Sequence, residues 1–310
     1  MFLVYPHLPR SGLGNMLFVW ARAVLFADIN SLPVVAPNWG QVRIGAYLRG
    51  ERDKRYYGNL FSDRDYLSKF RYLMMAPIKK NIYYNPTISK IEPSSLEIQK
   101  SDFHLFIFDK LPHWSDYFID LKEHQTLIKK KLISSIREPV FETIYNRPIP
   151  QIGIHIRMGD FKKLQPGDDF TKLGNVRTPI SWHIRVLSTI REVAGYDVSA
   201  TIFSDGHDDE LSEILKLPNV SRPPAASALS DLLTLSRSKL LITSAGSTFS
   251  SWASYLGQCP TIWHPAHFHS GVFPDGISQS VFEGGFDPES MTAPDLLTRN
   301  IKFTFEKSYV

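Results

Sequence analysis

The residues best suited to chemistry follow one short apolar segment in the middle of the chain. Residues 152–156 alternate isoleucines with Gly153 and His155, and Arg157 and Asp160 come next. The alternation predicts a strand, so Arg157 and Asp160 lie at or just past its carboxyl end, which faces the ligand crevice in open α/β sheets. A guanidinium presents a fixed fork of donors that suits a diphosphate without a metal ion. The alternative is an ordinary Arg–Asp ion pair at a strand end.

A second segment combines a predicted strand, a hydroxyl-rich turn and a helix start. The strand covers residues 239–243, and Ser247, Thr248 and Phe249 open the following helix. A helix N-terminus offers unpaired backbone N–H groups and the positive end of the helix dipole, to which serine and threonine add hydroxyl donors. The pattern favours an anion site, although Ser247 or Thr248 alone is also a common helix cap. Together with Arg157, it predicts a diphosphate site on neighbouring strands.

Two aspartates are candidates for contacts with the rest of a nucleotide. Asp205 ends a predicted strand over residues 198–203, and Asp231 lies in a predicted helix over residues 227–237. A carboxylate in a nucleotide cleft accepts hydrogen bonds from ribose hydroxyls or from the N–H groups of guanine. Each aspartate also has a plain alternative, as a helix cap or as a solvated charge.

Gly14 and Asn15 belong to a glycine-containing turn, Gly12–Asn15, directly after the first predicted strand. The turn is not a dinucleotide-binding fingerprint, because Leu17 occupies the position of the third glycine. Its glycines still permit the backbone to approach a ligand closely. Asn15 has the alternative role of an N-cap.

Two patterns that suggest metal binding have simpler explanations. Asp63-Arg64-Asp65 spells the DxD of metal-dependent sugar transferases, but it falls at the start of a helix predicted from Ser62 to about Met75, where acidic residues suit the dipole. The histidines at 264, 267 and 269 fit neither one helix face nor strand alternation, and no acidic residue adjoins them. We therefore expect neither a metal ion nor another cofactor.

The elements that must position these residues alternate between strand and helix. Strands are predicted at 2–5, 33–36, 104–108, 152–156, 198–203, 239–243 and 260–263, the last taken as the final strand. Helices are predicted at 15–30, 62–75, 117–138, 180–193, 227–237 and 248–256. This alternation is typical of α/β proteins with mainly parallel sheets. Prolines near 144–150 indicate a linker, which predicts domains at 1–146 and 147–264 followed by a tail, 265–310, packing back on them.

Length and composition exclude several classes of protein. The 310 residues suffice for two domains, and 43% hydrophobic and 21% charged residues are ordinary for a globular chain. A net charge of +4 suits an anionic small ligand or a weak membrane-surface contact, not nucleic acid. The single cysteine, Cys259, excludes a disulfide framework. With no long apolar run and no signal-peptide pattern, we expect a cytoplasmic protein with at most peripheral contact with the cytoplasmic face of the membrane.

Five segments share their order and residue types with known sequence motifs. They are Ser11–Asn15, Tyr57–Ser62, His155–Phe161, Phe203–Asp205 and Ser247–Ala253. The set resembles the bacterial α-1,2-fucosyltransferases of glycosyltransferase family 11, within the wider α-1,2-, α-1,6- and protein O-fucosyltransferase group. Met158 stands where the motif has a second arginine, and Met16 stands where it has glutamine, while the first arginine is kept as Arg157.

The resemblance implies a GT-B fold, in which two Rossmann-like halves face each other across a cleft. The N-terminal half would serve the glycan acceptor and the C-terminal half would hold a GDP-sugar. The implied reaction is inverting, metal-independent transfer of L-fucose from GDP-β-L-fucose to a sugar hydroxyl, in α-1,2 linkage. Arg157 would be catalytic, and the donor-binding set would be Gly14, Asn15, His155, Arg157, Asp160, Asp205, Asp231, Ser247, Thr248 and Phe249.

Alternatives remain at the level of the sequence. The donor could be another GDP-sugar, and the missing second arginine is also compatible with a nucleotide-sugar-binding protein without catalysis. The general base that takes the proton of the acceptor hydroxyl is open among Asp160, the Asp63/Asp65 pair and His7.

Overall fold

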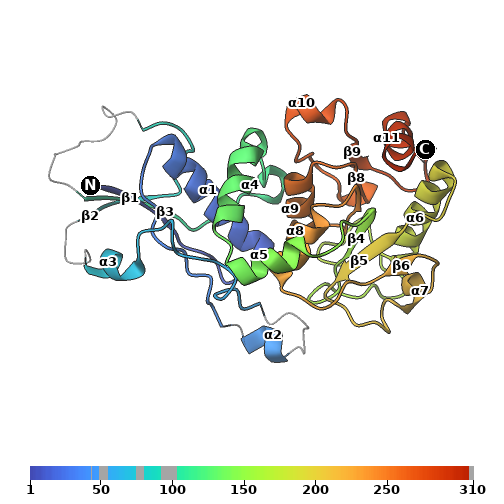
Figure 1. Ribbon diagram of the computed structural model, residues 1–310, viewed down its shortest axis with the longest axis horizontal. Helices are drawn as coiled ribbons and strands as arrows, with labels where there is room; N and C mark the ends of the chain where they lie inside the picture. Colours follow the sequence, from blue (N-terminus) through green and yellow to red (C-terminus); the bar gives the residue numbers. More distant parts are fainter. Residues whose placement is uncertain (43, 49–54, 75–79, 92–102, 307–310) are drawn as a thin grey trace. The chain divides into compact units, whose positions relative to one another are not determined.

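The computed structural model describes residues 1–42, 44–48, 55–74, 80–91 and 103–306. The chain divides into two compact units, the first made of Met1–Arg43 and Arg55–Phe141 and the second of Ile44–Lys54 and Glu142–Val310. Both units contain a parallel sheet with helices packed on it, which confirms the predicted α/β class (Figure 1).

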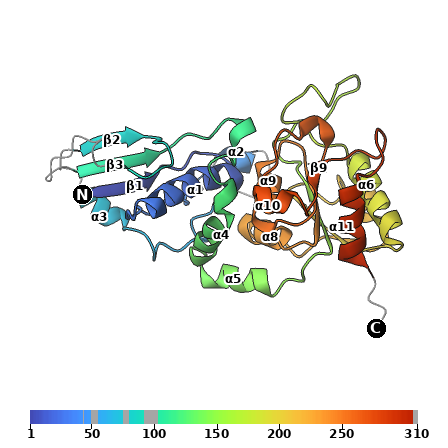
Figure 2. The same cartoon turned by 90° about the horizontal axis from the view of Figure 1, so that it is seen from above.

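The first unit is built on a parallel sheet in the order β1-β3-β2. These strands are β1 (Phe2–Pro6), β2 (Lys80–Tyr84) and β3 (Phe103–Phe108). Single parallel bridges, Val4 to Val34 and Val35 to Leu67, extend the sheet beyond β1. Helix α1 (Leu13–Ile29) runs beside β1 and β3 (Figure 2). Apolar side chains lie on nearly all sides of α1, which suits a helix buried in the middle of a unit.

Two predicted helices of the first unit are wrong in extent. Residues 62–68 form turns and an isolated bridge, and the helix there, α3, spans only Lys69–Met74; the predicted end at Met75 lies outside the described residues. The predicted helix 117–138 is divided into η3 (Lys122–His124), α4 (Gln125–Ser134) and the start of α5 (Glu138–Tyr145).

A tertiary contact explains the break between α4 and α5. Ile136 forms an antiparallel bridge with Phe61, and the N–H of Arg137 donates to Leu60 O at 3.0 Å. The backbone N–H of Arg137 thus pairs with another segment and does not continue the helix. Pro139 then stands in the first turn of α5, where its missing N–H costs no helical hydrogen bond. Two further short helices among the described residues are η2 (Trp114–Asp116) and α2 (Ile44–Leu48), the latter in a segment that belongs to the second unit.

The second unit contains a six-stranded parallel sheet in the order β6-β5-β4-β7-β8-β9. Its strands are β4 (Ile152–Ile156), β5 (Ala200–Ser204), β6 (Val220–Ser221), β7 (Leu240–Ile242), β8 (Thr261–Trp263) and β9 (Glu283–Gly285). The chain moves outward from β4 to β6, then crosses back and continues from β7 to β9. This is the doubly wound order, whose switch point lies between β4 and β7. The expectation that residues 260–263 form the final strand is wrong, because β9 extends the edge.

Helices cover both faces of this sheet. Helices α6 (Ile180–Ala194) and α11 (Asp295–Phe305) lie together on one face, and α8 (Ala228–Leu235) and α9 (Thr248–Gly257) on the other (Figures 1 and 2). Three further helices among the described residues of this unit are short: α7 (Ser212–Leu215), η4 (Pro265–His267) and α10 (Asp275–Ser278). No helix in the described ranges is both long enough and apolar enough to cross a membrane.

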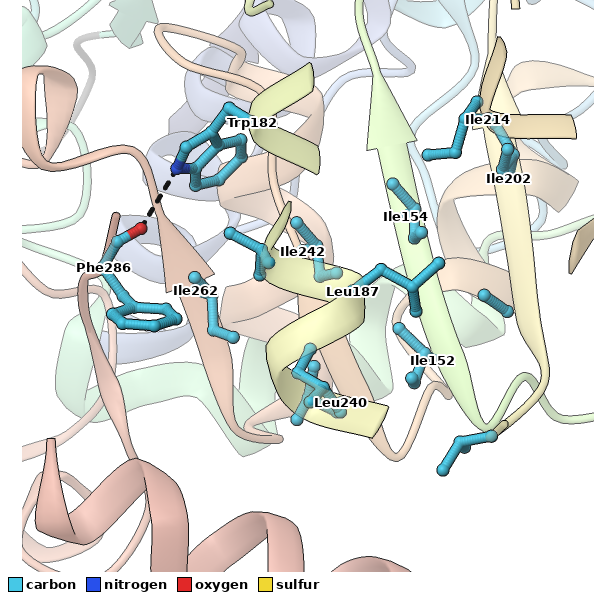
Figure 3. Close-up of a cluster of buried hydrophobic side chains, with 14 of the residues drawn as sticks. Ile152, Ile154, Trp182, Leu187, Ile202, Ile214, Leu240, Ile242, Ile262 and Phe286 are labelled. Atoms are coloured by element: carbon cyan, nitrogen blue, oxygen red, sulfur yellow. Dashed lines mark hydrogen bonds between the residues drawn. The ribbon is translucent and has the colours of Figure 1, made fainter. Parts of the chain in front are cut away.

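The core under α6 and α11 holds the central strands in place. Ile154, Ile242 and Leu187 are fully buried in it (Figure 3), and full burial of such a side chain stabilises a fold by about 1.5–3 kcal/mol. Trp182 Nε1 donates to Phe286 O at 3.1 Å, which links α6 to the segment after β9. The carboxyl ends of β4 and β7 are therefore carried by a rigid frame.

Candidate functional site

The switch point of the second unit brings together the two segments that the sequence analysis singled out. The backbone N–H of Arg157, just past β4, donates to Ser244 Oγ at 2.8 Å, just past β7. Ser244 Oγ in turn donates to His155 O at 3.0 Å. In a doubly wound sheet, ligands bind at the carboxyl ends of the strands on either side of this point.

His155 lies inside the protein behind this point and is only 4% exposed. Its Nδ1 is 2.7 Å from Ser250 Oγ, which also accepts the N–H of Ser244 at 3.0 Å, and its ring stacks on Phe249 at 4.8 Å. Burial, followed by the charge of Arg157, lowers the pKa of His155 well below its usual value. His155 is thus a neutral residue that ties β4, the 244 turn and α9 to one another, and its ring is not on the open surface.

Arg157 carries the positive charge of the site, with a side chain that is 21% exposed. Nη1 donates to Asp205 Oδ2, Nη2 donates to Asp160 Oδ1, and the guanidinium lies 5.6 Å from the centre of the Phe161 ring. Asp205 Oδ1 also accepts the N–H of Met158 at 2.8 Å. Asp205, predicted to accept hydrogen bonds from a nucleotide, accepts hydrogen bonds from Arg157 and from the backbone of its loop in this structure.

Met158 occupies a core position in this loop. It is 4% exposed, and it packs against Gly206 so closely that a Cβ there would lie 2.6 Å from Met158 Cγ. The position where the resembled motif has its second arginine is therefore apolar and buried in this chain, and Arg157 serves the site without that second arginine.

Helix α9 begins shortly after the turn in which Ser244 accepts the N–H of Arg157. Ser247 is at the N-cap position, yet its side chain makes no capping hydrogen bond, so the alternative of Ser247 as a plain cap is wrong. Gly246 has a φ of 64°, a conformation that favours glycine and turns the chain from β7 into the helix. Thr248 and Phe249 follow in the first turn and are half-buried.

Asp231 has a structural partner in another part of the unit. It lies in the first turn of α8, after the N-cap residue Ser227, and pairs with Arg147 Nη1 at 2.7 Å. Arg147 was not singled out from the sequence, because a lone arginine before a proline carries no recognisable pattern.

Gly14 and Asn15 lie in the first turn of α1, in the first unit. Asn15 does not cap this helix, because the N-cap position belongs to Gly12 and no side chain caps it. Asn15 Oδ1 and Ser11 Oγ are buried and have no hydrogen-bond partner among the described residues. Two buried polar atoms thus remain available at this helix start.

A cavity of about 410 Å³ opens at the carboxyl ends of β1 and of the 34–35 segment. The residues that line it include two aromatic rings, other polar side chains and apolar groups: Tyr5, His7, Leu8, Arg10, Asn38, Gly40, Gln41 and Val42. Tyr5 stacks with His7 at 5.8 Å, and Gln41 Nε2 donates to Leu8 O at 3.0 Å. Gln41 Oε1 is buried without a partner among the described residues. An aromatic ring beside convergent polar groups is a typical lining for a small polar ligand.

Sequence reasoning missed most of this cavity and named only His7. Arg10 is far from Asn38 and Gln41 in the sequence, and the three residues match no motif. Their only shared signal is that each follows a predicted strand of the same sheet, whose carboxyl ends meet at one edge.

The residues of the two metal-like sequence patterns lie in turns and in an aromatic cluster. Asp63 and Asp65 are exposed in the turns before α3. His264 and His267 pack edge-on against Phe170, each at 4.6 Å, and burial lowers the pKa of His264 to about 4. In the part of the chain that the structure describes, no three His, Cys, Asp or Glu residues are grouped so that they could hold a metal ion.

Comparison with known proteins finds structural likeness without close sequence relatives. No protein-family model and no curated protein matches the chain. Among solved structures, NodZ α-1,6-fucosyltransferase, from Bradyrhizobium, is 16% identical with a TM-score of 0.48, covering 82% of this chain and 92% of its own. POFUT1 in complex with GDP is 15% identical with a TM-score of 0.44, covering 84% and 97%. A mutant of Arabidopsis thaliana FUT1 with GDP is 14% identical with a TM-score of 0.44, covering 84% and 69%. Likenesses of this degree assign neither a family nor an activity to this chain.

Proposed function

We propose that this chain is an inverting glycosyltransferase that moves L-fucose from GDP-β-L-fucose to a hydroxyl of a glycan acceptor, in α-1,2 linkage and without a metal ion. The ordered motifs support the sugar and the nucleotide. The mechanism also needs one feature that the structure supplies, a cation at the switch point of a doubly wound sheet.

The observation that carries the proposal is the position of Arg157. Its backbone is hydrogen-bonded to Ser244 across the switch point, and Ser247, at the N-cap of α9, comes three residues after Ser244. A diphosphate placed there would meet the guanidinium from one strand and the helix N-terminus from the next. Such a site would donate hydrogen bonds to the phosphates from this chain's own groups.

Arg157 stabilises the leaving group in the proposed reaction. The acceptor oxygen attacks the anomeric carbon of fucose while the bond from that carbon to the β-phosphate oxygen breaks, and GDP leaves with the bonding electrons. Negative charge grows on the β-phosphate as the sugar gains oxocarbenium character. A donor fixed on that oxygen is worth more in the transition state than in the ground state, which raises turnover.

We propose His7 as the general base. Among the candidates, Asp160 is paired with Arg157, and Asp63 and Asp65 are exposed in turns, whereas His7 lines the cavity of the first unit. We propose that this cavity receives the acceptor sugar and that His7 takes the proton from its hydroxyl. That the two units face each other across a cleft stays a prediction.

A transfer assay with a panel of donors tests the proposal. GDP-fucose, GDP-mannose and UDP-galactose are each incubated with the protein and fucosylation-competent oligosaccharides, with EDTA or Mn²⁺, and products are read by mass spectrometry. We expect transfer from GDP-fucose only, unchanged by EDTA. Transfer from another GDP-sugar would replace fucose in the proposal, and binding of GDP without any transfer would indicate a non-catalytic binding protein. Activity that EDTA removes and Mn²⁺ restores would contradict the metal-free mechanism.

A further inference from the structure

Two carboxylates share the guanidinium of Arg157, and they are held in different ways. Asp205 comes from the turn after β5 and its side chain is 14% exposed. Asp160 is three residues beyond Arg157 in the same loop and its side chain is 38% exposed. Each takes one terminal nitrogen, Asp205 on Nη1 and Asp160 on Nη2.

Asp205 is locked in place from several directions. Its second oxygen accepts the N–H of Met158 at 2.8 Å, and a Cβ at Gly159 would lie only 2.3 Å from Asp205 Oδ2, so the loop packs directly on the carboxylate. Arg222 holds the turn that carries it, with Nη2 donating to Ser204 O at 2.8 Å and Nη1 to Gly206 O at 3.1 Å. Asp205 therefore has little freedom to leave Arg157.

Asp160 is the more exposed of the two carboxylates that pair with Arg157. It belongs to the polar loop between β4 and α6, where most side chains from residue 160 to residue 175 are exposed or half-buried. A carboxylate at an exposed position turns into solvent at small cost, because water solvates its charge and surface ion pairs contribute little. Nη2 is thus the nitrogen that can be vacated.

An incoming diphosphate and the Asp160 carboxylate are chemically alike. Both are anions that accept paired hydrogen bonds from a guanidinium, and both cannot occupy the same N–H donors. Two negative groups in contact also repel each other, more strongly at a partly buried site than in bulk water.

We propose that Asp160 is a placeholder that the diphosphate of the nucleotide displaces from Nη2 of Arg157, while Asp205 stays on Nη1 and positions the guanidinium. This inference rests on the proposed function, because it takes a nucleoside diphosphate as the ligand. It makes the two aspartates opposite in effect: Asp205 supports nucleotide binding, and Asp160 opposes it.

The test is calorimetric titration of GDP into wild-type protein and into the variants Asp160→Asn, Asp205→Asn and Arg157→Ala. Asp160→Asn should bind GDP about 2- to 10-fold more tightly, since it removes a surface ion pair and a like charge. Asp205→Asn should bind about 10-fold more weakly or worse, because it frees a partly buried guanidinium from its anchor. The gain from Asp160→Asn should vanish in the double variant with Arg157→Ala.

Asp169→Asn is the matched control. Asp169 lies in the same loop and pairs with Lys172 Nζ at 2.9 Å, so its replacement removes the same charge without touching Arg157. It should leave the affinity for GDP within about twofold, as expected for an exposed pair. Thermal unfolding of every variant confirms that each is folded.

The possible outcomes distinguish the role proposed for Asp160 from the proposed function of the protein. Unchanged or weaker GDP binding by Asp160→Asn, with wild-type binding intact and dependent on Arg157, would overturn the placeholder role alone. An equal gain from Asp169→Asn would also overturn it, because the effect would then be general electrostatics. Absence of GDP binding by the folded wild-type protein would overturn the proposed function and the placeholder role together.

Discussion

Both units carry polar side chains at the carboxyl ends of a parallel sheet, but these side chains are fixed by buried hydrogen bonds in the second unit and exposed in the first. At the edge of the second unit, Arg157, His155 and Ser244 are joined by short hydrogen bonds over a buried core. At the edge of the first unit, His7, Arg10 and Asn38 are exposed side chains around an open cavity. An edge that stabilises a growing charge benefits from groups fixed in advance, because they need no reorganisation during the reaction. An open edge suits a ligand recognised mainly by its hydroxyl groups.

The largest expected effect is at the sheet edge of the second unit. Arg157→Ala should lower kcat by about 10²–10³-fold, because a donor on the leaving phosphate is lost. Arg157→Lys should recover little, since an ammonium cannot reproduce the bidentate geometry. Steady-state kinetics with GDP-fucose measures both, and thermal unfolding checks the fold. A folded Arg157→Ala enzyme with more than about a tenth of wild-type turnover would contradict the role of Arg157.

The next effect concerns the sheet edge of the first unit, where His7 lines the cavity. His7→Gln should lower kcat by about 10²-fold, the usual contribution of a general base, while the affinity for GDP stays as in the wild type. Arg10→Gln is the control within the same cavity: it should raise KM for the acceptor more than it lowers kcat. If His7→Gln and Arg10→Gln change only KM, His7 is a binding residue and not the base.

A smaller effect tests whether stability and activity depend on the buried hydrogen bonds at the sheet edge of the second unit. Ser250 is fully buried and contacts both His155 and Ser244, so Ser250→Ala should lower the free energy of unfolding by about 1–3 kcal/mol. It should also reduce kcat several-fold by loosening the strand end. Ser251→Ala, one residue on, should stay within about 0.5 kcal/mol of the wild type. Urea unfolding of both variants shows whether the loss of stability is specific to the buried hydroxyl of Ser250.

The smallest effect is a pH dependence of stability in the second unit. His183 is fully buried between Pro179 O and Thr243 O, and burial lowers its pKa to about 4. The unfolded chain takes up a proton near the ordinary pKa of 6.5, whereas the native state does so only near 4, so stability falls as pH decreases through this window and is insensitive to His183 above it. The slope is at most about 1.4 kcal/mol per pH unit for this group.

His183→Gln isolates that contribution. The variant should be less stable than the wild type at neutral pH, yet its stability should fall less steeply between pH 6.5 and 4, because the titrating group is gone. His155 and His264 face the same region and have lowered pKa values, so part of the slope should remain. An identical slope in the variant and the wild type would show that His183 does not contribute.

The sequence by itself determined the parts of this protein that depend on local pattern. Alternating apolar residues located β4, and a helical repeat located α1 and α6, because periods of two and of three to four residues report directly which face is buried. The same reasoning placed Arg157 and Ser247 at strand and helix ends, since parallel strands carry their carboxyl ends to one edge.

Tertiary structure alone decided which groups meet. The break at Ile136 follows from pairing with Phe61, and β9 exists because a neighbouring strand offers its edge to residues 283–285. The partners of Arg157 lie both three and 48 positions away, and the buried ring of His155 is hydrogen-bonded to Ser250, 95 positions on. No periodicity encodes such distances, because a hydrogen bond or an ion pair depends on where the chain returns in space and not on how far apart two residues are in sequence.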